Sequence, residues 1–316
     1  MFRKRLFESA ETLIFDPVAS NRNATRAALH ALGFNKIELA ASLEALDAFL
    51  KMNHPDLLLA ELAGSEAALC DVVQSIRQGR LGANPFLVVI VTTWRRDGDL
   101  VAKVVNSGAD DVVVRPFSTS QLGERIRAQI ERRKPFVVTQ EYSGPDRRRD
   151  SSRPGAECFE VPNTLRLRAL DGLTDDQAEH KIREDLARGT EVVNAQRLRL
   201  DAVQLRAQWR LLEQREAGSR DFLAILSWLE AITKDMKLRA ASRGDSVLGA
   251  CDSIVASIQT ALNARKSASD GSDFSPPLQL LRQSVLSLAQ MFAPDEEFAA
   301  ASPQRLAASR AQRPAA

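Results

Sequence analysis

Four polar side chains stand where short apolar runs of the sequence end, and their types could act together. They are an acid, a second acid, a hydroxyl and a cation: Asp16, Glu61, Thr92 and Arg115. If the apolar runs are parallel strands of one sheet, their carboxyl ends meet at one edge, where ligands of open α/β sheets bind. We therefore predict that these four side chains line one small polar pocket.

The elements that would position this pocket lie between Glu11 and about Arg133. Strand-like runs alternate along this part of the chain with helical patterns. The runs are 12–15, 36–40, 56–62, 86–91 and 112–114, and the helical patterns are 23–32, 42–52, 67–77, 99–107 and 118–132. Runs without polar alternation are typical of strands buried on both faces, and this alternation indicates repeated βα units. The predicted fold class is α/β, with a doubly wound, flavodoxin-like, five-stranded parallel sheet.

Four segments of this region carry a family resemblance: LIFDPVASNRNATRAALHALGF, HPDLLLAEL, VVIVTT and GADDVVVRPF, in this order. They resemble the receiver domain of bacterial response regulators, over roughly residues 11–133. In that family an Asp at the end of the third strand accepts a phosphoryl group, and acids after the first strand hold Mg²⁺. A hydroxyl at the end of the fourth strand turns toward the phosphoryl group, and a Lys contacts it from before a Pro, usually across a cis bond. The resemblance implies that Asp16 is a metal-holding acid, Thr92 the switch hydroxyl and Arg115 the counterpart of the Lys.

The sequence departs from the family pattern at several of these positions. Pro17 stands where the second metal-holding acid belongs, so Asp16 is only a weak candidate ligand. We therefore expect no metal or other cofactor, because any binding of Mg²⁺ would be weakened. Glu61 stands at the phosphoacceptor position, and its extra methylene moves the carboxylate by about 1.5 Å. Arg115 presents a planar fork in place of a compact ammonium. The loop 63–69 also lacks the Pro and Asp-Gly that usually follow the phosphorylation site.

These departures suggest an atypical receiver, a pseudo-receiver. Our hypothesis is that Glu61 is a permanent negative charge facing Arg115 and Thr92, which fixes the receiver in one state. Other interpretations of the same residues stay open. Glu61 could be a solvated acid, and Arg115 could pair at the surface with an acid of the Asp110-Asp111 pair. Asp56 is expected to be a turn residue at the start of the third strand, although it is also the nearest alternative to Glu61 as the phosphoacceptor.

The remaining chain is predicted to divide after residue 133. Residues 134–172 are rich in Pro, Gly and Arg, which indicates a linker or an arm lying on a neighbouring part. Its YSGPDRRR segment has no predicted role, because the run Arg147 to Arg149 is flanked by acids and is typical of a solvated arm. Residues 299–316 are typical of a disordered tail.

Residues 173–298 are predicted to be helical throughout. Thr174 with Gln177 forms a capping box, and apolar residues then follow a three-and-four spacing to Gly218. Such a helix would be about 60 Å long, so its apolar stripe needs a partner. Further helices follow from Ser219, through 247–262 and from Ser275. We expect an all-α helical bundle, with the long first helix free to form a coiled-coil homodimer.

The helical half shows no motif for an activity of its own. His180 is its only histidine and lacks the small neighbours of a phosphotransfer helix, whereas Trp209 and Trp228 lie on apolar helices and are typical of packing. No phosphate loop, paired metal ligands or nucleophile elbow occurs. We therefore expect no enzymatic activity.

Composition limits the function further. The chain has 316 residues and 43 basic against 41 acidic side chains, so the formal charge of +2 provides no field that draws it onto nucleic acid. Its 3 cysteines have no disulfide or zinc spacing, and no apolar run reaches the length of a membrane span. We expect a cytoplasmic signalling protein of a two-component phosphorelay, with protein partners such as a histidine kinase. The alternatives are a non-enzymatic dimeric scaffold that uses the receiver fold as a docking surface and, with less support, a DNA-binding regulator.

Overall fold

The computed structural model describes residues 7–62, 64, 66–148, 157–170, 175–240, 244–266 and 275–293. It divides into two compact units, Met1–Val193 and Asn194–Ala316. The described part of the predicted linker or arm, residues 134–172, belongs to the first of these units. The prediction of a disordered tail, residues 299–316, lies outside the described residues.

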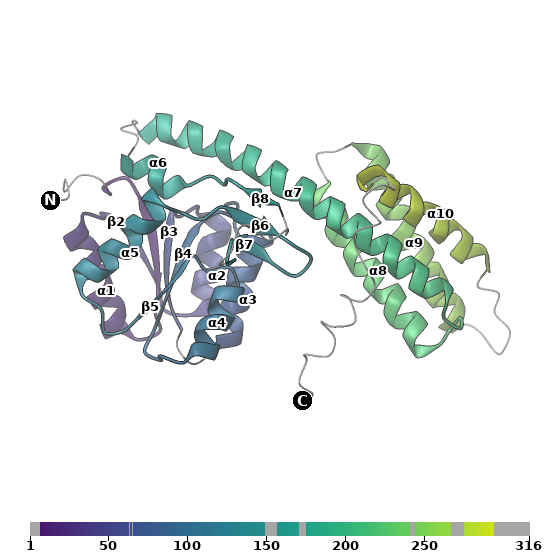
Figure 1. Ribbon diagram of the computed structural model, residues 1–316, viewed down its shortest axis with the longest axis horizontal. Helices are drawn as coiled ribbons and strands as arrows, with labels where there is room; N and C mark the ends of the chain where they lie inside the picture. Colours follow the sequence, from purple (N-terminus) through teal and green to yellow (C-terminus); the bar gives the residue numbers. More distant parts are fainter. Residues whose placement is uncertain are drawn as a thin grey trace. The chain divides into compact units, whose positions relative to one another are not determined.

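A parallel sheet forms the centre of the first unit (Figure 1). Its strands follow the order β2-β1-β3-β4-β5, which is a doubly wound arrangement and confirms the predicted fold class. The strands are β1 (Glu11–Phe15), β2 (Lys36–Ala40), β3 (Leu57–Glu61), β4 (Val88–Thr93) and β5 (Asp111–Val114). Every residue of β3 and β4 is buried, as their continuous apolar runs predict.

Helices cover both faces of this sheet. They are α1 (Ala19–Leu32), α2 (Leu43–Met52), α3 (Glu66–Arg77), α4 (Gly98–Asn106) and α5 (Thr119–Glu131). Buried side chains of α2, α3 and α4 form one core cluster with the sheet, and those of α1 and α5 form another. Polar side chains cap the starts of two helices. Ser42 caps α2 by accepting a hydrogen bond from the amide of Ala45, and Ser118 forms a capping box with Gln121 at the start of α5.

The segment after α5 is more ordered than the sequence predicts. It forms a small antiparallel sheet of β6 (Phe136–Val138), β7 (Ser143–Pro145) and β8 (Cys158–Phe159), followed by α6 (Thr164–Leu170). Strands of 3 residues or fewer carry no readable periodicity, which explains why the sequence indicated only a linker or arm. Of these two alternatives the structure favours the arm, because Phe136, Val138 and Leu165 are all buried.

Two buried ion pairs attach this arm to the amino end of the sheet. Arg133 Nε lies 2.9 Å from Asp110 Oδ1, and Arg168 Nε lies 2.9 Å from Asp56 Oδ2. Asp110 also pairs with the fully buried Arg77, at 2.7 Å. Arg77 and Arg133 flank the buried Phe136 ring. The guanidinium carbon of each lies 5.2 Å from the ring centroid, which is within the range of a cation–π contact.

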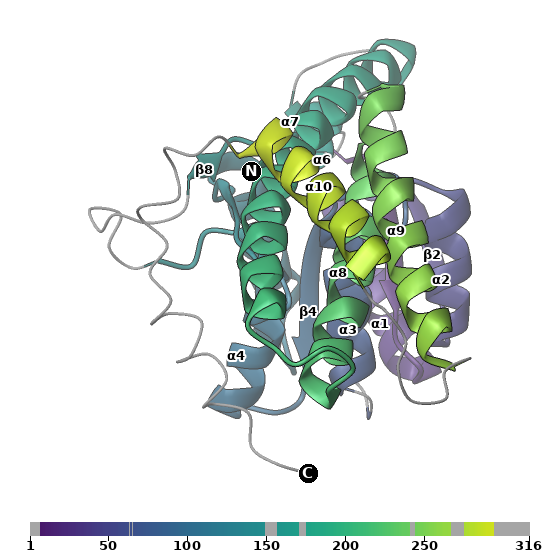
Figure 2. The ribbon, with the colours of Figure 1, turned by 90° about the vertical axis from the view of Figure 1, so that its right-hand side faces the viewer.

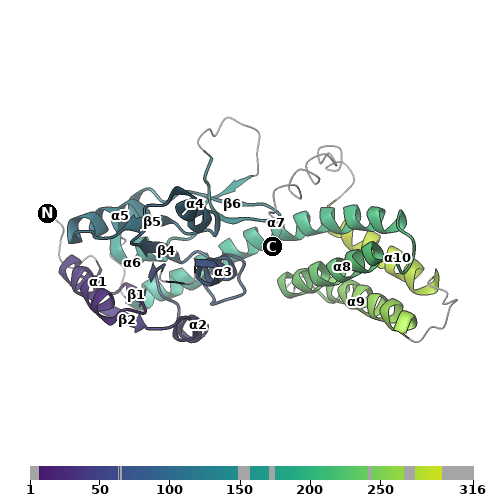
Figure 3. The ribbon, with the colours of Figure 1, turned by 90° about the horizontal axis from the view of Figure 1, so that it is seen from below.

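A second unit is built from helices around its own core. The long helix α7 (Asp175–Glu213) contributes its second half, together with α8 (Arg220–Arg239), α9 (Asp245–Lys266) and α10 (Ser275–Phe292). Figures 2 and 3 show α9 and α10 side by side, and Ser219 caps α8 as the sequence suggests. The predicted cap at Thr174 lies outside the described residues. The predicted helical bundle is confirmed.

Part of α7 packs into the core of the second unit, and a coiled-coil dimer through this helix stays a prediction. One apolar face of α7 contains Leu198, Ala202, Leu205, Trp209 and Leu212, and all of these are buried in the core of the second unit. They are therefore covered by helices of the same chain. None of the described helices has the length and apolarity needed to pass through a membrane.

Candidate functional site

The structure brings the four predicted side chains together at the carboxyl edge of the sheet. β3 and β4 pair in parallel with Glu61 opposite Thr92, so the two residues leave the sheet at the same level. Thr92 Oγ1 donates a hydrogen bond of 2.5 Å to Glu61 Oε2. Arg115 Nε donates a second hydrogen bond of 2.6 Å to the same oxygen. The acid, the hydroxyl and the cation thus form one connected cluster.

Arg115 is the centre of this cluster, because its guanidinium contacts every other member. One terminal nitrogen lies 3.4 Å from Asp16 Oδ2 and 3.4 Å from Thr92 Oγ1. The guanidinium carbon also lies 4.7 Å from the centroid of the Phe117 ring. The bond between Arg115 and Pro116 is cis, as the family resemblance implies. A planar fork with several donors suits this task better than an ammonium, which has a single donor atom.

Asp16 is held at the end of β1 by the backbone around it. It is fully buried, and its Oδ1 accepts a hydrogen bond of 2.9 Å from the amide of Val18. Its backbone carbonyl accepts a hydrogen bond from Arg22 of α1. Because its other carboxylate oxygen faces Arg115, Asp16 serves here as a second counter-ion of the guanidinium.

Burial controls the electrostatics of the site. Glu61 is 3% exposed, Thr92 is 1% exposed and Arg115 is 8% exposed. Loss of hydration raises the pKa of the Glu61 carboxyl, whereas the hydrogen bonds from Thr92 and Arg115 lower it, and burial is the larger effect. The arginine is therefore needed to keep an anion in a place that disfavours one.

The alternative interpretations of these residues are wrong in the structure. Glu61 is not a solvated strand-end acid, because its carboxylate is buried. Arg115 does not pair with Asp110 or Asp111, which instead pair with other arginines. Asp56 lies at the amino end of β3, where its Oδ2 accepts a hydrogen bond from the amide of Glu11 at 2.9 Å. It is therefore at the opposite edge of the sheet from the site.

Sequence reasoning missed one member of the site, Thr25. This residue is 1% exposed on α1, and its hydroxyl accepts a hydrogen bond of 2.9 Å from Arg115. Its own hydroxyl donates to the carbonyl of Asn21, one turn earlier. A threonine inside an Ala-rich helix has no local signal, because hydroxyl back-bonding to the preceding turn is common. Its role depends on Arg115, which lies 90 residues away along the chain.

The donor set does not fit Mg²⁺ as the family resemblance would imply. Mg²⁺ prefers several oxygen ligands in octahedral geometry. Beside Asp16 stands a guanidinium, which repels a cation, and Pro17 offers no side-chain oxygen. Among the described residues, no group of 3 or more His, Cys, Asp or Glu side chains could hold a metal ion.

Comparisons with known proteins agree with a receiver domain. A scan against protein-family models found no match. Over 125 residues the chain is 29% identical to "Probable transcriptional regulator ycf27" of Porphyridium aerugineum, covering 40% of this chain and 50% of that protein. The protein of the same description from Cyanophora paradoxa is 28% identical over 122 residues, covering 38% and 48%. The chain thus spans about half the length of the curated relatives that it matches.

Two solved structures are similar to part of the chain. A signal receiver domain from Clostridium thermocellum has a TM-score of 0.35 and 18% identity, covering 39% of this chain and 98% of that one. A response regulator from Thermotoga maritima has a TM-score of 0.33 and 25% identity, covering 37% and 95%.

The strand order and the side chains at the strand ends define the first unit as a receiver-type α/β domain. It resembles the receiver domain of two-component response regulators, and its similarity to the two curated transcriptional regulators extends over 125 and 122 residues.

Proposed function

We propose that the protein is a signalling protein of a bacterial two-component pathway whose receiver is held in one state by its own side chains. The observation that supports this proposal is the pair of hydrogen bonds that Glu61 accepts from Thr92 and Arg115. In the family that the sequence resembles, a phosphoryl group at this position attracts the hydroxyl and the cation. Here a permanent carboxylate has the same two partners without any modification.

The same geometry argues against chemistry at Glu61. Two charge-assisted hydrogen bonds stabilise the carboxylate and lower its reactivity as a nucleophile. The extra methylene also displaces the carboxylate by about 1.5 Å relative to Asp, which is enough to spoil an attack geometry. We therefore propose that the protein is not an enzyme and acts through protein–protein contacts, with a histidine kinase or another signalling protein as partner.

Treatment with a small phosphodonor and Mg²⁺ tests the first part of this proposal. We expect the intact mass of the wild-type chain to stay unchanged, and an adduct of one phosphoryl group would refute the proposal. Glu61→Asp is the matched variant, because it restores the family's acceptor and changes nothing else. Mg²⁺-dependent labelling of this variant would show that the rest of the pocket is competent and that Glu61 alone prevents labelling.

Partner capture tests the second part. We expect Glu61→Ala to change the set of proteins retained by the full-length chain, because Arg115 and Thr92 lose their shared acceptor. The control is Arg125→Met, which alters a charge that is exposed at the surface of the same unit. If Glu61→Ala retained the same partners as the wild type, the site would not set the signalling state.

We also propose that the protein forms a homodimer through its helical region. The alternative function, a dimeric scaffold, requires the same homodimer. The observation that favours it is the exposure of Leu280 and Met291 on α10, at 54% and 47%. Sedimentation velocity of the full chain is expected to give twice the mass of one chain, and Leu280→Gln with Met291→Gln is expected to give one chain mass. A wild type that sediments as one chain would exclude the dimer.

A further inference from the structure

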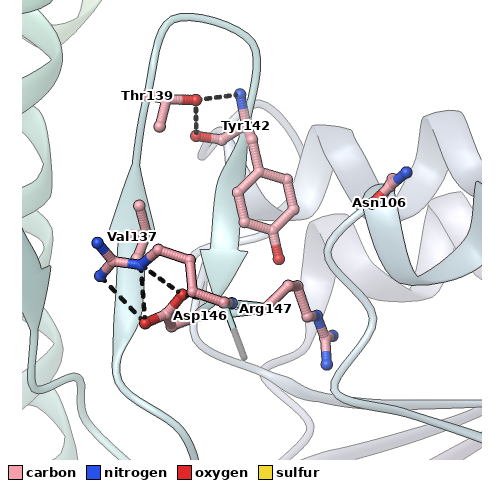
Figure 4. A pocket seen from close by; sticks show the side chains of 7 residues that line it. Asn106, Val137, Thr139, Tyr142, Asp146 and Arg147 are labelled. Atoms are coloured by element: carbon pink, nitrogen blue, oxygen red, sulfur yellow. Dashed lines mark hydrogen bonds and ion pairs between the residues drawn. The ribbon is translucent and has the colours of Figure 1, made fainter. Parts of the chain in front are cut away.

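The described part of the YSGPDRRR segment, residues 142–148, has no role in the receiver site but lines a pocket at the opposite end of the first unit. The pocket has a volume of about 360 Å³ and lies between the β6–β7 hairpin and the end of α4. Its walls come from Asn106, Val137, Thr139, Tyr142, Asp146, Arg147 and Arg148. Figure 4 shows the Tyr142 ring between the hairpin and Asn106, with the Arg147 side chain below the ring.

The backbone of the segment is fixed against the turn between α4 and β5. Gly108 has φ +105°, and a Cβ there would meet Arg77 Cγ at 2.8 Å and the Ser143 carbonyl oxygen at 3.0 Å. A Cβ on Gly144 would meet the Tyr142 hydroxyl at 2.8 Å and Gly108 Cα at 3.0 Å. These glycines therefore let two backbones touch, which makes the floor of the pocket rigid.

The Tyr142 side chain is held in place on this floor. Its hydroxyl donates a hydrogen bond of 2.8 Å to the carbonyl of Pro145. Thr139 closes the hairpin, because its hydroxyl accepts a hydrogen bond of 3.1 Å from the Tyr142 amide. An aromatic ring that is preorganised in this way can stack on a planar ligand at little entropic cost.

The two arginines of the pocket differ in how their charge is compensated. Arg148 forms an ion pair with Asp146, with its Nε 3.0 Å from Oδ1 and its terminal nitrogen 3.1 Å from Oδ2. This pairing lowers the pKa of Asp146 to about 2, so the two charges cancel. Arg147 donates hydrogen bonds to the backbone carbonyls of Ala109 and Asp110, which carry no net charge.

Arg147 is thus the cation of the pocket that has capacity for an anion. Within the described part of the chain it forms no direct ion pair, although its charge opposes the rise that burial causes in the pKa of the Asp111 carboxyl and of the Tyr142 hydroxyl. Its buried Nε has no hydrogen-bond partner. A half-buried guanidinium that lacks a direct ion pair is stabilised when an anion binds beside it. We propose that this pocket binds a small planar organic anion, whose ring packs on Tyr142 and whose carboxylate or phosphate pairs with Arg147.

Ligand-detected NMR with the full-length chain tests this proposal. The probes are benzoate and phenyl phosphate, which share a ring and differ in the anionic group, with benzyl alcohol as the neutral comparison. We expect one or both anions to bind the wild type and benzyl alcohol to bind at least about 10-fold more weakly, since a charged hydrogen bond contributes that much. The stronger of the two anions identifies the preferred headgroup.

Variants locate the binding. Arg147→Gln is expected to weaken anion binding by about 10- to 100-fold, and Arg147→Lys, which keeps the charge, by less. Arg80→Gln removes an exposed arginine elsewhere in the first unit and is expected to change nothing. The proposal is overturned if neither anion binds the wild type at about 10 mM. It is also overturned if benzyl alcohol binds as tightly as the anions, a comparison that needs no variant.

Discussion

Replacing Arg115 by Met removes the cation at the centre of the receiver site and leaves two buried acids. Glu61 would keep only its bond to Thr92, and Asp16 would face an apolar side chain at 0% exposure. Breaking a buried pair by removal of one partner costs about 3–5 kcal/mol. The opening equilibrium of the first unit should therefore increase by about 100- to 5,000-fold, because each 1.4 kcal/mol is a factor of ten.

Hydrogen exchange followed by mass spectrometry measures this change for each part of the chain. Peptides from β1, β3 and β4 should exchange faster in Arg115→Met, while peptides from α8 and α9 serve as an internal control because they belong to the second unit. Arg125→Met is the matched variant, since its pair with Asp111 is exposed and contributes at most about 1 kcal/mol.

The double replacement Glu61→Met with Arg115→Met sharpens the test. Removing both charges leaves only Asp16 uncompensated, so the double variant should be more stable than Arg115→Met alone. The electrostatic account of the site would be refuted if Arg115→Met accelerated exchange no more than Arg125→Met did. It would equally be refuted if the double variant were less stable than the single one.

Three further changes test other parts of the molecule. Burial and the neighbouring Asp235 raise the pKa of Asp201 to about 6, so its contribution to stability is present below about pH 4 and is lost as the pH rises through about 6. Asp201→Asn should therefore stabilise the second unit by about 2 kcal/mol at pH 7 and by little at pH 4, measured by thermal melting at both pH values. Gly108→Ala should lower the free energy of unfolding of the first unit by about 2 kcal/mol or more in urea titrations, whereas Gly98→Ala, where a Cβ meets nothing within 4 Å, should not. Ser219→Ala removes the cap of α8 and should speed exchange at its first turn, with a loss of about 1 kcal/mol.

Much of the receiver fold can be predicted from the sequence because each strand is a short, continuous apolar run between turn residues. The run 36–40 matches β2 in both bounds, whereas α1 begins four residues before the predicted helix, at Ala19. Helix starts without a capping side chain are hard to place, and Val18 at this N-cap makes no side-chain hydrogen bond.

The residues of the candidate site likewise include some that the sequence predicts and one that it does not. Asp16, Glu61, Thr92 and Arg115 could be predicted because the strand ends of a parallel sheet share one edge. Thr25 could not, because its role depends on a contact across the fold and not on a local pattern. Similarly, the length of α7 indicated that its apolar stripe needs a partner, but it did not show that other helices of the same chain cover one apolar face of α7.

The ion pairs at the amino end of the sheet bear on how this protein can be divided for study. A fragment that stops at residue 133 would keep all five strands of the main sheet but would lose Arg168, which is the counter-ion of the buried Asp56. It would also lose Phe136, whose ring lies against the arginines that neutralise Asp110. Such a fragment would expose apolar surface and retain partners non-specifically. Binding experiments on an isolated receiver should therefore use a fragment that extends to Val193, where the first compact unit ends.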